Sequence, residues 1–300
     1  MSGRSWGIAL VVTAGSVAPM PAQQNWDTIR IRPIQVAPGL HMLMGAGGNI
    51  GVSAGPDGVF LVDDQYAPLT EKIVAAIRSF SDRPIRFVLN THWHGDHTGG
   101  NENLGKSGAL LVAHDNVRRR MSVEQLREGL LATVAPSPRG ALPVVTFTQA
   151  VTFWLNDDEI HVFHVAHAHT DGDAIIHFRR ANAIHMGDTY FNGGWPFIDI
   201  TTGGSVEGVI AAADAVLRIA NGETRIIPGH GSLSNVTELR AFRDMLAAVR
   251  ERVRAEIAQG RTVEQILAAN VTAEWDGKLT GSRERFLRFL HRELARPRNP

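Results

Sequence analysis

The sequence predicts an α/β protein that forms one domain after a short leader. Between residues 34 and 227, short apolar runs typical of strands alternate with longer amphipathic patterns typical of helices, and turn residues separate them. The 300 residues are enough for one large α/β domain. No internal repeat or linker divides residues 23–300, so we expect a single domain there.

The first half should form a β-meander followed by a β-α-β unit. The turn Gly55-Pro56-Asp57-Gly58 separates two of the apolar runs, and a helical stripe then precedes a buried strand. Strands are expected at 40–44, 49–54, 59–63 and 85–89, and a helix at 69–80.

The second half continues the alternation and ends in helices. Strands are expected at 110–114, 151–155, 160–165, 174–178, 183–186 and 225–227. Helices are expected at 116–131, 205–219, 235–258, 263–269 and 282–294. The proline-rich stretch 135–143 should be a surface loop.

Charge and cysteine content exclude several classes of function. Thirty Lys and Arg residues balance 30 Asp and Glu residues, so nothing indicates a surface for nucleic acid. The chain has no cysteine, which rules out disulfides and thiolate metal ligands.

The N-terminus has the pattern of an export signal. Arg4 precedes an apolar run at 6–18, and prolines and small residues follow. This run is short for a membrane span, so we predict a cleaved signal peptide at 1–22 and a mature chain that is periplasmic or secreted and free of the membrane.

The stretch Thr91-His92-Trp93-His94-Gly95-Asp96-His97 follows the expected strand 85–89. A loop at a strand end is able to aim these side chains at one point. Imidazole is a good ligand for zinc, and a carboxylate adds the negative charge that a second cation requires. This stretch therefore predicts a metal site.

The pattern His-x-His-x-Asp-His after a strand resembles the metallo-β-lactamase superfamily, and the resemblance extends from about residue 35 to 230. It implies a four-layer αβ/βα sandwich of two mixed sheets flanked by helices, with a metal site at the rim of the sheets. The motif is specific to the superfamily but not to one reaction, so the substrate must be argued from the site.

The resemblance also implies the other ligands. His169 in Ala168-His169-Thr170-Asp171 is preferred over His167 because the residues after it fit the family pattern. With Asp188 of Gly187-Asp188-Thr189 and His230 of Gly229-His230-Gly231, the implied site holds two Zn²⁺ ions. The expected ligands are His92, His94 and His169 for the first ion, Asp96, His97 and His230 for the second, and Asp188 for both.

Such a site implies a hydrolase in which a metal-activated hydroxide attacks a carbonyl group of a small molecule. Asp96 would serve as a ligand and would also orient the water. A metal-binding protein without catalysis is the less favoured alternative.

Three substrate classes remain open. Many true β-lactamases of this superfamily have Cys or Ser at the position of Asp188 and hold the substrate carboxylate with a nearby lysine, whereas residues 189–192 here include no lysine. Export nevertheless favours β-lactam hydrolysis, which we take as the leading prediction. Lactone or ester hydrolysis is the alternative, with Tyr190 as the residue that contacts the carbonyl. Thioester hydrolysis like that of glyoxalase II would require basic residues, and Arg179 and Arg180 lie in an expected turn instead.

Aromatic residues near the motifs are candidates for the substrate pocket. Trp195 and Phe197 follow Asp188 closely and are predicted to form an apolar wall, with Trp93 on the opposite wall. His114 follows a strand but has no place in the ligand set, so we expect a structural role for it.

Overall fold

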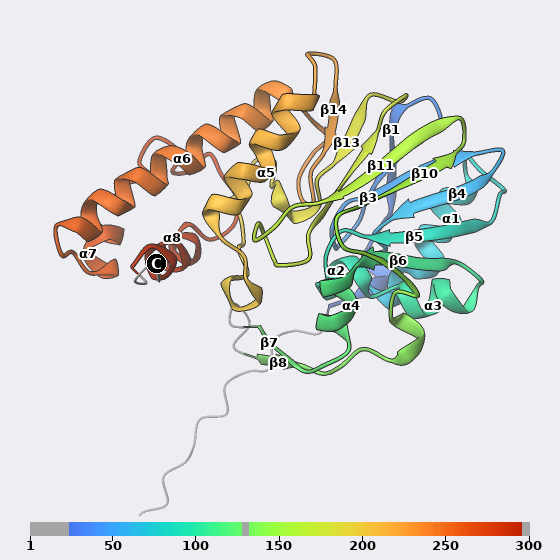
Figure 1. The fold of residues 1–300 in the computed structure, drawn as a ribbon, viewed down its shortest axis with the longest axis horizontal. Coiled ribbons are helices and arrows are strands. Elements are labelled where there is room, and N and C mark those ends of the chain that lie inside the picture. The colour runs from blue at the N-terminus through green and yellow to red at the C-terminus, as the bar shows by residue number, and fades with distance from the viewer. Residues whose placement is uncertain (1–23, 128–131, 296–300) are drawn as a thin grey trace, which may run out of the picture.

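The computed structural model describes residues 24–127 and 132–295, which form two β-sheets with helices on their outer faces (Figure 1). In the first sheet the N-terminal strands pair antiparallel, whereas β4, β5, β6 and β9 run parallel. Its order is β1 (Arg32–Ala37), β2 (Leu40–Met44), β3 (Ile50–Gly55), β4 (Gly58–Val62), β5 (Ile85–Asn90), β6 (Leu110–His114) and β9 (Val145–Phe147).

The second sheet is also mixed, because β13 and β14 pair parallel and the other neighbours pair antiparallel. Its order is β10 (Ala150–Leu155), β11 (Asp158–His164), β12 (Ala174–Phe178), β13 (Ala183–His185), β14 (Arg225–Ile227) and β15 (Ser234–Asn235). The two mixed sheets match the prediction from the sequence.

Alternation along the strands places one set of side chains between the sheets and the other against helices. In β4, Phe60 faces the second sheet and packs edge-on against Phe153, with ring centroids 4.9 Å apart. Its neighbours Val59 and Leu61 face the other way, into the cluster that holds Ile73 of α1. The core between the sheets therefore joins them into one sandwich.

Helices cover both outer faces and complete the four layers. The helices α1 (Thr70–Arg78) and α3 (Asn101–Lys106) pack on the first sheet, and α5 (Val206–Ile219), α6 (Val236–Ala258) and α8 (Arg283–Leu294) pack on the second (Figure 1). The shorter helices are α2 (Gly95–Thr98), α4 (Asp115–Met121) and α7 (Val263–Ala268). The predicted αβ/βα sandwich is confirmed.

The helix expected at 116–131 is wrong from 122 to 127, and its last residues, 128–131, lie outside the described residues. Helix α4 ends at Met121, and β7 (Gln125–Arg127) then pairs antiparallel with β8 (Ala132–Val134). Val123 and Leu126 are more than half exposed, so a longer helix would have no apolar face to bury.

The predicted leader, 1–22, lies outside the described residues. In the part that is described, no helix combines the length and apolar character needed to cross a membrane.

Candidate metal centre

The seven predicted ligands all follow the ends of strands, at one rim of the sandwich that the two sheets form. The chain leaves β5 at Asn90 and turns into α2, which brings His92, His94, Asp96 and His97 to this rim. The other three come from the second sheet, where His169 lies between β11 and β12, Asp188 follows β13, and His230 follows β14.

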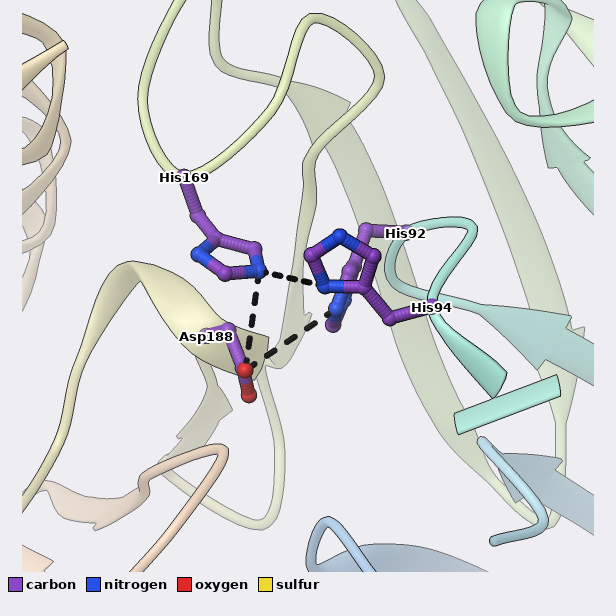
Figure 2. A group of neighbouring side chains, drawn as sticks. All are labelled: His92, His94, His169 and Asp188. Carbon is purple, nitrogen blue, oxygen red and sulfur yellow. Dashed lines mark hydrogen bonds and ion pairs between the residues drawn. The ribbon is translucent and has the colours of Figure 1, made fainter. Parts of the chain in front are cut away.

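The first group of donor atoms comes from His92, His94, His169 and Asp188, which point toward one another (Figure 2). Its four donor atoms lie within 4.8 Å of one another, and all four residues are buried. His169 Nε2 lies 2.9 Å from His94 Nδ1 and 3.6 Å from Asp188 Oδ2. This spacing suits donors that share one ion.

The second group consists of Asp96, His97 and His230. His230 Nε2 lies 3.3 Å from Asp96 Oδ2. The other oxygen of Asp188, Oδ1, lies 3.1 Å from His97 Nε2 and 3.4 Å from His230 Nε2. Asp188 therefore presents one carboxylate oxygen to each group, as a bridging ligand would.

The residues present fit divalent ions. Within the described part of the chain, His92 Nε2, His97 Nε2 and Asp188 Oδ1 are buried without a hydrogen bond. Burying such atoms without a partner costs free energy, so their convergence requires an explanation. Imidazole nitrogens and carboxylate oxygens aimed at a common point are the donor set of a metal site.

Two glycines let the backbone pass close to these donors. A Cβ atom on Gly48 would lie 2.0 Å from Cε1 of His97, and one on Gly229 would lie 2.1 Å from Oδ1 of Asp188. Any larger residue at either position would displace a donor.

The electrostatics of the cluster reflect dense charge in a buried space. Burial lowers the pKa of His92, and the neighbouring histidines lower it further, which favours the neutral imidazole that a metal requires. For His230, burial acts to lower the pKa, but Asp188 and Asp96 outweigh it and raise the pKa to about 9. For Asp188, burial acts to raise the pKa, but His230 and His97 hold it well below its usual range. The carboxylate is thus ionised and ready to bind a cation.

A second layer of hydrogen bonds orients the histidine rings. Asp63 Oδ2 lies 2.7 Å from His97 Nδ1, and Asp199 Oδ2 lies 3.0 Å from His94 Nε2. His169 Nδ1 lies 2.7 Å from the carbonyl oxygen of Phe197. With these nitrogens donating, the opposite nitrogen of each ring is left free to bind an ion. Neither Asp63 nor Asp199 belongs to a motif that would mark it in the sequence.

Beside the donors lies a cavity of about 330 Å³. Both groups of donors line it, together with Phe191, Trp195 and Phe197. Phe197 and Trp195 therefore form part of an apolar wall as predicted, although Trp195 is only 6% exposed and stacks on Phe286 in the core. Trp195 therefore packs in the core and also lines part of the cavity.

Two residues predicted to belong to the site, Tyr190 and Trp93, lie outside it. The Tyr190 side chain is fully buried, its hydroxyl lies 2.7 Å from Ser234 Oγ, and its ring packs against Phe242. It is turned into the core and does not line the cavity, so the predicted carbonyl contact is wrong.

Trp93 is 4% exposed and packs with Val117 of α4 in a small cluster beneath the motif. The flanking histidines, His92 and His94, face the metal site, whereas Trp93 faces the interior. It does not line the cavity, so its assignment to the opposite wall is wrong.

His169, His167 and His114 have the roles that the sequence predicts. His169 joins the donor group, whereas His167 lies outside it, with Nδ1 3.0 Å from the carbonyl oxygen of Gly203. His114 caps α4 by accepting from the backbone of Asn116 and stacks on His164, which is a structural role.

Comparison with known proteins agrees with this architecture. The family described as the metallo-beta-lactamase superfamily matches residues 45–231. A curated relative, the hydroxyacylglutathione hydrolase of Nitrosococcus oceani, is 30% identical over 56% of this chain and 57% of its own length. The matched parts span only 31% and 57% of the first two curated relatives.

Two solved structures share the fold. The sec-alkylsulfatase Pisa1 from Pseudomonas sp. is 18% identical, with a TM-score of 0.64 over 88% of this chain and 50% of that one. A metallo-beta-lactamase from Pontibacter korlensis is 16% identical, with a TM-score of 0.59 over 73% of this chain and 99% of that one. At these identities the likeness concerns the fold.

Proposed function

The chain belongs to the metallo-beta-lactamase superfamily of hydrolases, and we propose that it uses two zinc ions to hydrolyse a small molecule at a carbonyl group. The observation that carries the proposal is the position of Asp188, with one carboxylate oxygen toward each group of histidines. A shared carboxylate between two sets of donors is what a site for two ions requires.

The ions would supply an activated water at neutral pH and polarise the carbonyl oxygen of the substrate. The protein holds the donors rigidly, since Asp63 and Asp199 fix the rings of His97 and His94. Asp96, which is partly exposed and lines the cavity, would both bind an ion and orient the water. Phe191 and Phe197 keep one side of the cavity apolar and limit the access of water.

Among acyl substrates, we favour β-lactams. The cavity has a positively charged side chain, Arg285, on its wall, which supports a substrate with a carboxylate although no lysine follows directly after Asp188. The lactonase alternative loses its specific residue, because Tyr190 is in the core.

Thioester hydrolysis is the second candidate, favoured by the hydroxyacylglutathione hydrolase relative. A glutathione thioester carries several charges, however, and Arg179 and Arg180 are engaged elsewhere. Arg179 pairs with Glu159 at 2.5 Å, and Arg180 lies 3.4 Å from Asp157. Neither lines the cavity.

The test compares zinc-loaded and chelated protein on a chromogenic cephalosporin, a lactone and an acyl thioester. His169→Asn and His167→Asn form a matched pair, because only the first removes a predicted donor. We expect His169→Asn and Asp188→Ala to lower kcat/KM by more than about 100-fold, since losing a direct ligand should exceed the effect of losing a group behind it. His167→Asn should retain activity.

Equal loss in both histidine variants would contradict the metal assignment. Thioester turnover that exceeds cephalosporin turnover would move the chain to the second candidate. No zinc-dependent turnover of any substrate would leave a metal-binding protein without catalysis.

We further propose that the chain is exported and that its leader is removed near residue 22. The support is the pattern of Arg4 and the apolar run 6–18. Cell fractionation followed by N-terminal sequencing of the mature protein is the test, and a full-length chain in the cytoplasmic fraction would contradict it.

A further inference from the structure

Arg285 lines the cavity and is the one arginine that does so among the described residues. It belongs to α8, the last helix of the described chain, and lines the cavity together with the metal donors. The carboxylates that line the cavity, Asp96 and Asp188, both belong to the metal groups. In the described part of the chain, no acidic side chain other than these two metal-site carboxylates lines the cavity beside Arg285.

Within residues 24–127 and 132–295, the guanidinium of Arg285 has no ion pair or side-chain hydrogen bond; its contact is the ring of Phe197, whose centroid lies 5.2 Å from Cζ. Other arginines of the same helix behave differently. Arg288 lies 3.1 Å from Glu264 and 2.8 Å from Glu284, and Arg283 lies 3.8 Å from Asp276. Unlike these two arginines, Arg285 has no acidic partner among the described residues.

Phe197 connects this cation to the metal centre. Its ring centroid lies 5.9 Å from that of His94 and 5.7 Å from that of His169. Phe197 therefore contacts both the guanidinium and two rings of the first group of donors, and all of them except His169 line the same cavity.

One side of the cavity lies outside the stretch that the family matches. Thr280, Gly281 and Arg285 line the cavity, whereas the family matches residues 45–231. The predicted metal donors fall within that stretch, and this side of the cavity comes from α8 and the segment just before it.

We propose that Arg285 binds a carboxylate group of the substrate and selects anionic over neutral substrates. This inference rests on the proposed function, because it assumes that the reacting carbonyl lies at the metal centre. A guanidinium matches a carboxylate with two parallel hydrogen bonds, and the apolar face of Phe197 strengthens them by excluding water on one side. Two charge-assisted hydrogen bonds make such a group a determinant of specificity.

The test uses calorimetry and kinetics on the zinc-loaded protein and on three variants. Arg285→Met removes the charge at similar length, Arg285→Lys keeps the charge but not the planar fork, and Arg288→Met is a matched control on the same helix. Binding is measured for phenylbutanoate, its neutral amide and butyl sulfate. Turnover is measured for a carboxylate-bearing cephalosporin and its methyl ester.

We expect the wild-type protein to bind phenylbutanoate more tightly than the amide, and Arg285→Met to lose roughly 10- to 100-fold in affinity for the acid alone. Arg285→Lys should recover part of the loss, and Arg288→Met should match the wild type. The preference for the free acid over the methyl ester in kcat/KM should fall by a similar factor in Arg285→Met.

An unchanged affinity for the acid in Arg285→Met would overturn the proposal, because the anion would then be held by the metal ions alone. Tighter binding of butyl sulfate through Arg285 would overturn the choice of a carboxylate. Binding is measured without turnover, so a protein that hydrolyses none of the substrates would refute the proposed function while the calorimetry still decides the role of Arg285.

Discussion

Asp63→Asn should weaken zinc binding although it replaces no ligand. Asp63 is fully buried and accepts three hydrogen bonds. Its Oδ1 accepts from the backbone of Thr91 at 2.7 Å, and its Oδ2 accepts from the Thr91 hydroxyl at 2.8 Å and lies 2.7 Å from His97 Nδ1. The residue has a positive φ of 63°, a conformation that asparagine adopts readily, so the backbone should survive the change.

The amide satisfies only half of this arrangement. If the amide oxygen stays on the Thr91 backbone, the NH₂ group faces His97 Nδ1 and favours the tautomer whose proton sits on Nε2, the metal-binding atom. If the amide turns over, the NH₂ group faces the Thr91 N–H. In either orientation the NH₂ group faces another hydrogen-bond donor, so one bond of Asp63 is lost. The loss of such a supporting group typically costs 10- to 100-fold in metal affinity, or about 1.4 to 2.7 kcal/mol.

The assay is zinc titration against a chromophoric chelator, with unfolding measured in parallel. Asp64→Asn is the matched control, because Asp64 is also buried but accepts from the Gly100 backbone and no metal histidine. Burial raises the pKa of Asp64, so a neutral amide should be tolerated there. Zinc affinities in Asp63→Asn that stay within about threefold of the wild type would refute the reasoning, since the second layer would then carry no weight.

Three other predictions follow from the same contacts. Gly48→Ala should lose about one zinc ion per chain by colliding with His97, whereas Gly222→Ala, with open space around it, should keep the wild-type stoichiometry in metal analysis. Tyr190→Phe should lower the free energy of unfolding by about 1 kcal/mol through loss of the bond to Ser234 and leave kcat/KM unchanged; a large fall in kcat/KM would restore a catalytic role. Chelation should lower the Tm, because zinc at about 100 times its Kd stabilises the folded state by about 2.7 kcal/mol, and an unchanged Tm would argue against bound ions.

The metal site was most predictable from the sequence where metal-binding residues directly follow a predicted strand. His92, His94 and His97 follow an apolar strand within a few residues, so their convergence was predictable from local pattern and the family resemblance. The positions of the strands followed from the alternation of apolar residues, because one face of each strand must be buried.

Other parts of the site depend on contacts that no local pattern encodes. Asp63 and Asp64 are adjacent acidic residues at the end of one strand, yet the side chain of Asp63 contacts the His97 ring whereas that of Asp64 accepts from the Gly100 backbone. Tyr190 follows Asp188 by two residues, and the 3₁₀-helix η5 (Gly187–Thr189) turns its ring into the core. Arg285 lies far along the chain, so its approach to the cavity required the packing of α8 to be known.

The architecture separates metal binding from substrate selection. Strand β5 of the first sheet leads to four donors and the second sheet supplies three, so bound ions would fasten the two sheets along their shared edge. Arg285 comes from a helix that contributes no donor. Sites that share no partner usually have additive effects on free energy. Substitutions at Arg285 should therefore change which substrate is bound while leaving zinc affinity intact, and those at Asp63 should do the reverse. A double variant whose losses simply multiply would show that the C-terminal helices set specificity on a metal centre that functions independently of them.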